Sequence, residues 1–191
     1  MRTRLMFALL ALTAVADART RPLVHVPLEW RPTSALRLGA AQMPQTPIGF
    51  AAFEDVRTDK EAIGENREDR VPKLVTTSSD VGAFVSTHMR ELFDEAGLKA
   101  VDGNGAVTIK GEVRQFFVRE TSTYRSEIAV HVEVIGRDGK TRWSGTASGD
   151  ARRFGRSYEL EDYYEVLSDA LVNTVSSLLQ SPDFRRALAG P

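Results

Sequence analysis

The sequence predicts an α/β protein, a two-layer sandwich in which two helices cover one face of a mixed, mainly antiparallel sheet. Two observations support this. Residues 106–149 contain three successive runs of alternating apolar and polar residues, which is typical of strands with one buried face. Long amphipathic segments lie on both sides of these runs and can cover that face. The expected order of elements is β-α-β-β-β-β-α.

Length and composition favour one domain. The chain has 191 residues, of which 42% are hydrophobic and 27% charged, enough for a single core. A formal charge of -1 and a pI of about 6.3 give no bulk attraction for nucleic acid. The chain has no cysteine, which excludes disulfides, thiolate nucleophiles, cysteine-ligated zinc and thioether lipid anchors.

Residues 1–18 have the pattern of a secretory signal peptide. Arg2 and Arg4 precede an apolar run over residues 5–15, and Ala16-Asp17-Ala18 offers small residues to a signal peptidase. The run is too short for the roughly 20 residues of a membrane span. We therefore expect cleavage after Ala18, no transmembrane segment after cleavage, and a periplasmic or secreted protein.

The next segment, residues 19–46, contains four prolines and predicts an extended leader, with residues 23–26 as a candidate edge strand. A single α/β domain is expected over residues 47–191. Its first strand is predicted at residues 48–53, which are apolar on both faces. A charged loop is expected from there to residue 70, followed by a short extended piece at 73–77.

The first helix is predicted to start at Ser78-Ser79-Asp80, whose side chains can accept from the free N–H groups of a first turn. Gly97 is expected to end it. A short strand at 98–101 and a turn at 102–105 then lead into the three alternating runs. The residues predicted to face the core are Val107, Ile109, Val113 and Phe117 in the first run, Ile128, Val130, Val132 and Val134 in the second, and Trp143, Gly145 and Ala147 in the third.

The second long helix is predicted over residues 159–180, because Leu160, Tyr163, Leu167 and Leu171 keep helical phase. Ser181-Pro182 ends it, and residues 183–188 can form a final short helix.

Asp55, Arg57 and Asp59 form the best candidate cluster, at the expected end of the first strand. Carboxylates at a strand end are common in metal and acid–base sites. The simpler interpretation is structural: Asp55 and Arg57 point the same way and form an ion pair that holds the loop. No residue is assigned as catalytic or metal-binding, and no cofactor is expected.

Other polar residues give weaker signals. His25, His88 and His131 lack metal-ligand spacing; His88 is expected to be a hydrogen-bonded histidine at the edge of the core, and His131 to pair across strands with Arg114 or Arg142. Gly103-Asn-Gly105 lacks a dinucleotide fingerprint. A final group interleaves arginine with aromatic residues and is expected to form a solvated loop, or one that meets an anionic partner or lipid headgroup, rather than a nucleic-acid site: Arg152, Arg153, Phe154, Arg156 and Tyr158.

The layout of the whole chain resembles the YajG family of bacterial envelope lipoproteins. The resemblance rests on short motifs in a fixed order: Val24-His25-Val26, Asp55-Val56-Arg57-Thr58-Asp59, Ser78-Ser79-Asp80, Ala96-Gly97-Leu98, Asp102-Gly103-Asn104-Gly105, Gly139-Lys140 and Asp169-Ala170-Leu171-Val172-Asn173. That family carries a lipidated cysteine after its signal, and this chain has none. The resemblance implies an envelope protein and brings no catalytic residues with it.

The sequence therefore predicts a non-enzymatic periplasmic accessory or scaffold protein that binds another envelope component, protein or lipid. Two alternatives stay open. One is a carrier of a small apolar ligand or lipid, which requires a dry cavity between helices and sheet. The other is a hydrolase or metal-dependent enzyme that uses the Asp55 loop, which requires a pocket and a perturbed carboxylate. The oligomeric state is left open.

Overall fold

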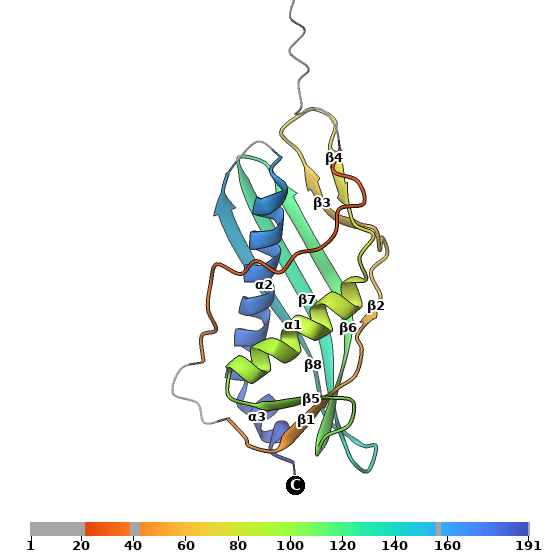
Figure 1. Ribbon diagram of the computed structural model, residues 1–191, viewed down its shortest axis with the longest axis vertical. Helices are drawn as coiled ribbons and strands as arrows, with labels where there is room; N and C mark the ends of the chain where they lie inside the picture. The colour runs from red at the N-terminus through yellow and green to blue at the C-terminus, as the bar shows by residue number, and fades with distance from the viewer. Residues whose placement is uncertain (1–21, 39–42, 156–157, 191) are drawn as a thin grey trace, which may run out of the picture.

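The computed structural model describes residues 22–38, 43–155 and 158–190, and it confirms the predicted fold class (Figure 1). A mixed sheet of eight strands forms one layer and the helices lie on one of its faces. The expected signal peptide, residues 1–18, lies outside the described residues. The elements are β1 (Pro47–Phe50), β2 (Glu54–Asp55), β3 (Ala62–Asn66), β4 (Lys73–Thr76), α1 (Val81–Glu95), β5 (Lys99–Asp102), β6 (Val107–Glu120), β7 (Thr123–Gly136), β8 (Thr141–Phe154), α2 (Leu160–Gln180) and α3 (Pro182–Leu188).

Strand β6 organises the sheet. Along one edge it pairs antiparallel with β7, which in turn pairs with β8, so the three alternating runs do form a meander. Along its other edge it pairs in succession with β1, β2 and β3, all of them parallel. Strand β5 extends the sheet beyond β1, and β4 extends it beyond β3. Strands β1, β2 and β3 thus follow one another along one edge of β6.

The region between residues 48 and 70 differs from the prediction. The expected strand at 48–53 is split, since β1 ends at Phe50 and β2 begins at Glu54. Between them Phe53 turns into the core, where its ring occupies the space beside Gly111; a Cβ on that glycine would lie 2.5 Å from the ring. The expected charged loop contains a strand, β3, which pairs with β4 as a hairpin.

The inward pattern of β6 changes phase in mid-strand. Val107, Ile109 and Val113 are buried as predicted, but the register against β7 shifts between Val113 and Gln115. A bulge of this kind adds one residue and exchanges the two faces of the strand beyond it. Phe116 is therefore buried, and the prediction that Phe117 faces the core is wrong. The inward residues of β7 are buried as predicted.

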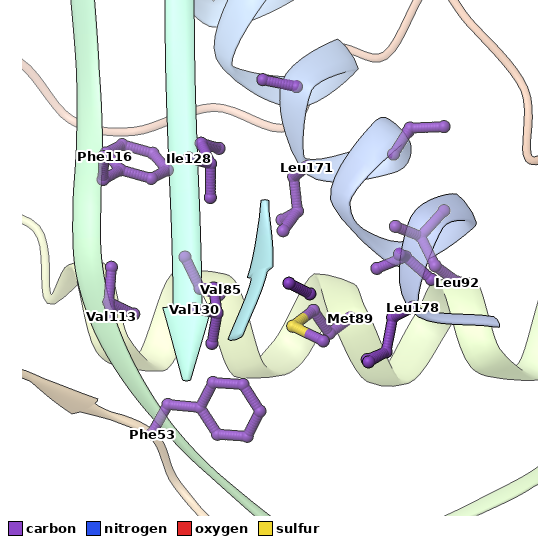
Figure 2. Packing of buried hydrophobic residues seen from close by; sticks show 14 of the residues in the cluster. Phe53, Val85, Met89, Leu92, Val113, Phe116, Ile128, Val130, Leu171 and Leu178 are labelled. Atoms are coloured by element: carbon purple, nitrogen blue, oxygen red, sulfur yellow. The ribbon is translucent and has the colours of Figure 1, made fainter. Parts of the chain in front are cut away.

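Both long helices begin and end close to their predicted positions. Asp80 caps α1 by accepting from the N–H of Ala83, and Gly97 follows the helix with a φ of 82°. The apolar stripes of α1 and α2 meet the inward side of β6, β7 and β8, where Met89, Val130 and Leu171 are fully buried (Figure 2). Helix α2 lies especially close to β8: a Cβ on Gly149 would lie 2.4 Å from the backbone nitrogen of Thr174. The two layers are thus in tight contact.

Residues 22–38 form a strap that crosses the helices on the side away from the sheet (Figure 1). Residues 22–38 contain no helix, and the candidate strand at 23–26 is reduced to one bridge between Val26 and Thr77. The backbone of the strap is held by side chains of α2: the N–H of Arg31 donates to Ser168 Oγ (2.9 Å), and the N–H groups of Thr33 and Ser34 donate to Asp169 Oδ1 (2.7 and 2.8 Å). Trp30 stacks on His88, with ring centroids 4.4 Å apart.

Candidate functional site

The cluster predicted at Asp55, Arg57 and Asp59 lies at a gap in the sheet. Strand β2 pairs with β6 at residues 112–113 and β3 pairs with it at 118–120, while the chain between β2 and β3 loops away from β6. The Arg57 side chain fills the gap. Its Nη1 donates to the carbonyl oxygens of Ala62 (2.7 Å) and Phe116 (3.2 Å), and its Nη2 donates to that of Lys60 (2.6 Å).

Asp55 completes the coordination of this guanidinium. Arg57 Nε donates to Asp55 Oδ1 (2.9 Å) and Nη2 to Oδ2 (2.8 Å), a bidentate pair in which both side chains are largely buried. With the three carbonyl contacts, all five guanidinium N–H groups have an acceptor. Asp59 lies apart from this pair and accepts from the backbone N–H groups of Glu61 and Ala62.

The electrostatics of Asp55 follow from this pairing. Burial raises the pKa of Asp55, but the hydrogen bonds from the side chain and backbone of Arg57, together with its charge, outweigh burial and leave the pKa below its ordinary value. The carboxylate is thereby held ionised and directed at Arg57. An open hollow of about 380 Å³ lies beside the cluster, lined by Arg57, Asp59, Leu74 and Phe117 among others.

Asp55→Asn is expected to lower the free energy of unfolding by about 1 kcal/mol near pH 7, because the ion pair becomes a weaker neutral contact. A carboxylate with a depressed folded-state pKa stabilises above its unfolded pKa, near 4, and that contribution is lost as pH falls through the folded value. Chemical denaturation of wild type and variant from pH 3 to 7 should therefore converge at the acid end. Hydrogen exchange should also quicken over residues 59–70.

The enzyme alternative makes the opposite prediction for Asp55→Asn. A catalytic carboxylate is commonly held at a cost to stability, so neutralising it leaves stability unchanged or raises it. A stabilised Asp55→Asn variant with unchanged exchange over residues 59–70 would contradict the structural interpretation.

A second polar cluster, around Glu120, was not predicted from the sequence. This carboxylate is fully buried at the end of β6; it accepts from the Tyr163 hydroxyl (2.8 Å) and from the backbone N–H of Tyr158 (2.8 Å). Burial raises the pKa of Tyr163, and the charge of Glu120 raises it further. The Tyr158 hydroxyl accepts from the N–H of Leu23 and donates to the carbonyl of Leu74. Glu120 thus positions the residue that ties the strap to the sheet.

The predicted roles of the histidines have mixed outcomes. His88 is hydrogen-bonded at the edge of the core, as predicted, with Nδ1 2.7 Å from Glu91. His131 lies on the outer face, but the predicted pairing with Arg114 or Arg142 is wrong. Its neighbours across the strand are Glu112 and Thr146, and its Nε2 lies 3.2 Å from Ser144 Oγ. The two arginines pair with acidic residues close to them in sequence.

The predicted arginine and aromatic loop is divided by the structure, since Arg152, Arg153 and Phe154 belong to β8. Arg153 points inward and pairs with Asp162 and Glu165, while Arg152 and Phe154 are exposed. Tyr158 is tied to the strap rather than solvated, and Arg156 lies outside the described residues. Within the described ranges, no three histidine, aspartate or glutamate side chains come together as a metal site, and no helix is long and apolar enough to cross a membrane.

Comparison with known proteins gives a fold and no family. No family model matches the chain, and no curated protein matches it. Among solved structures, protein XCC0632 from Xanthomonas campestris, described as DUF330, is similar over 86% of this chain and 94% of its own, with 15% identity and a TM-score of 0.57. This likeness shows a shared fold.

Two further likenesses to solved structures are weaker. A PelC dodecamer from Paraburkholderia phytofirmans is similar over 72% of this chain and 94% of its own, with 12% identity and a TM-score of 0.43. Lipoprotein GNA1162 from Neisseria meningitidis is similar over 57% of this chain and 84% of its own, with 13% identity and a TM-score of 0.35. Membership of the YajG family stays a prediction.

Proposed function

We propose that this protein is a non-enzymatic accessory protein of the bacterial cell envelope, exported by its signal peptide, which binds another envelope component through the outer face of β6, β7 and β8. The observation that carries the proposal is the asymmetry of the sheet. The strap and helices α1 and α2 lie on its inner face, and no described element covers the outer face of its three longest strands.

The outer face is polar and contains two open hollows. One open hollow of about 520 Å³ is lined by residues of β6, β7 and β8, including Gln115, Glu127 and Asp150. A second, of about 420 Å³, lies nearer the other end of the strands and is lined by residues that include Lys110, His131 and Glu133. Charged and hydroxyl side chains around shallow hollows suit a polar partner surface better than a small apolar ligand.

The two alternatives receive less support. A carrier needs space between helices and sheet, whereas α2 lies against β8 too closely to admit a Cβ at Gly149. An enzyme using the Asp55 loop needs a free carboxylate, whereas both oxygens of Asp55 accept from Arg57. The neighbouring structures carry no enzyme description.

Site-specific photo-crosslinking in the native envelope tests the proposal. A photoreactive residue in place of Thr146, in the middle of the outer face, should give a discrete adduct. The matched control replaces Ser177, which is exposed on α2. If the Thr146 position gave no adduct, or if the Ser177 position gave an equal one, the proposal that the outer face binds the partner would be contradicted.

A further inference from the structure

Three arginines lie side by side across the outer face at one end of the sheet. Arg119 of β6 is directly opposite Arg125 of β7, which is directly opposite Arg152 of β8, and all three are exposed. Directly opposed side chains on neighbouring strands have Cβ atoms about 5 Å apart, and like charges so placed repel. We call these three residues the arginine row.

The row is incompletely neutralised by the protein itself. Arg119 lies 3.6 Å from Glu65 and 3.9 Å from Glu127. Among the described side chains, neither Arg125 nor Arg152 forms an ion pair within 4 Å. The acidic residues of this face lie one step further from the end of the sheet, where Glu127 of β7 is opposite Asp150 of β8. That step is two residues, or about 7 Å along a strand.

Exposed apolar side chains lie on the other side of the row, at the tip. Phe154 is two residues beyond Arg152 and is 84% exposed. Val71, in the turn between β3 and β4, is 74% exposed, and the same turn exposes two basic and two acidic residues, Arg67, Glu68, Asp69 and Arg70. The strand register places Phe154 and Val71 at one end of the sheet. Phe154 of β8 pairs with Thr123, at the start of β7. The next residue of β7, Tyr124, pairs with Glu120 at the end of β6. Glu120 in turn pairs with Asn66, the last residue of β3 before the turn that contains Val71. This end is uppermost in Figure 1.

The described chain also begins at this end. The carbonyl of Leu23 accepts from Thr76 of β4, and its N–H donates to Tyr158, which lies between β8 and α2. The first described residues of the chain therefore lie near Phe154 and the turn between β3 and β4.

We propose that this end of the sheet docks on an anionic lipid surface. Phe154 and Val71 enter the interface, the arginine row meets the phosphates, and the acidic pair stays in water. Along β8 the order Phe154, Arg152, Asp150 matches the change from hydrocarbon through headgroups to solvent. A protein partner that binds mainly through apolar contacts would favour one contiguous apolar patch, whereas Phe154 lies at the end of β8 and Val71 lies separately in the turn between β3 and β4.

The inference rests on the proposed function only for its setting in the envelope, and purified protein tests it separately. The probe is vesicles of phosphatidylglycerol and phosphatidylethanolamine, compared with vesicles of phosphatidylcholine alone in a sedimentation assay. We expect binding to the anionic vesicles to be at least about tenfold tighter and to weaken as salt rises.

Variants test whether vesicle binding depends on the arginine row or only on the net charge of the protein. Arg125→Gln with Arg152→Gln should weaken binding to anionic vesicles about tenfold, and Phe154→Ser should weaken it severalfold. The matched control, Lys99→Gln with Lys140→Gln, removes the same charge at the opposite end of the molecule and should bind like wild type. A thermal melt of each variant confirms folding.

Several outcomes would overturn the proposal. Equal binding to both kinds of vesicle, or an equal loss of binding in the lysine control, would do so. Full displacement of the protein from vesicles by millimolar inorganic phosphate would indicate a site for free phosphate. A dimer that Phe154→Ser dissociates would indicate that a second copy of the chain covers this end. Absence of vesicle binding with a retained Thr146 adduct would reject the lipid surface and leave the proposed function standing.

Discussion

Leu171→Ala and Val130→Ala are each expected to lower the free energy of unfolding by about 2–4 kcal/mol. Both side chains are fully buried, Leu171 on α2 and Val130 on β7, and they lie at the contact between the two layers (Figure 2). Truncation removes buried methyl groups and leaves a cavity that tight neighbours fill only in part. Urea unfolding followed by circular dichroism measures the change.

The matched control is Thr146→Ala, on the strand next to Val130 but facing outward. It should change the free energy of unfolding by less than about 0.5 kcal/mol. A control as damaging as the two core variants would mean that the faces of β7 and β8 are exchanged.

Arg57→Met is expected to cost about 3–5 kcal/mol, the range for a buried ion pair that loses one partner. Methionine retains much of the side-chain stem but donates nothing. Asp55 then keeps a buried charge without its counter-ion, and the carbonyls of Lys60, Ala62 and Phe116 lose a donor. The effect should exceed that of Asp55→Asn because the arginine also joins two strands.

Arg114→Met is the control for Arg57→Met. Arg114 is also an arginine near this edge of β6, but it is about half exposed and pairs only with Glu112. Its loss should cost no more than about 1 kcal/mol. Thermal and urea unfolding of both variants should therefore differ clearly; similar losses would show that the gap beside β6 does not depend on Arg57.

The parts of this fold that could be predicted are those in which apolar residues recur with one regular period over many residues. The meander and both long helices show such periods, and the cap of α1 at Asp80, its end at Gly97 and the turn at Gly139 use residues with strong local preferences. Strand β3 was missed because its sequence, Ala-Ile-Gly-Glu-Asn, is short and lies among charges, and its pairing with β6 is made across 54 residues of chain (Gly64 to Val118). The bulge after Val113 could not be predicted either, because it depends on how β6 pairs with β7.

The same distinction applies to the polar residues. The pairing of Asp55 with Arg57 could be predicted because the two residues are two positions apart in an extended segment. The three carbonyls that Arg57 binds could not, since they depend on the gap between β2 and β3. The alignment of Arg119, Arg125 and Arg152 depends on the registers of two strand pairs, β6 with β7 and β7 with β8, and each pair contains a register shift.

The strap has a consequence for the order in which the chain acquires its structure. The N–H of Arg37 donates to Ser176, 139 residues later, and the carbonyl of Arg37 accepts from Gln180. Synthesis proceeds from the N-terminus, so residues 31–37 are made long before residues 168–180 of α2, to which they bind. The first half of the strap binds residues 76–79 and can attach earlier. Docking of residues 31–37 therefore has to wait until α2 has been made.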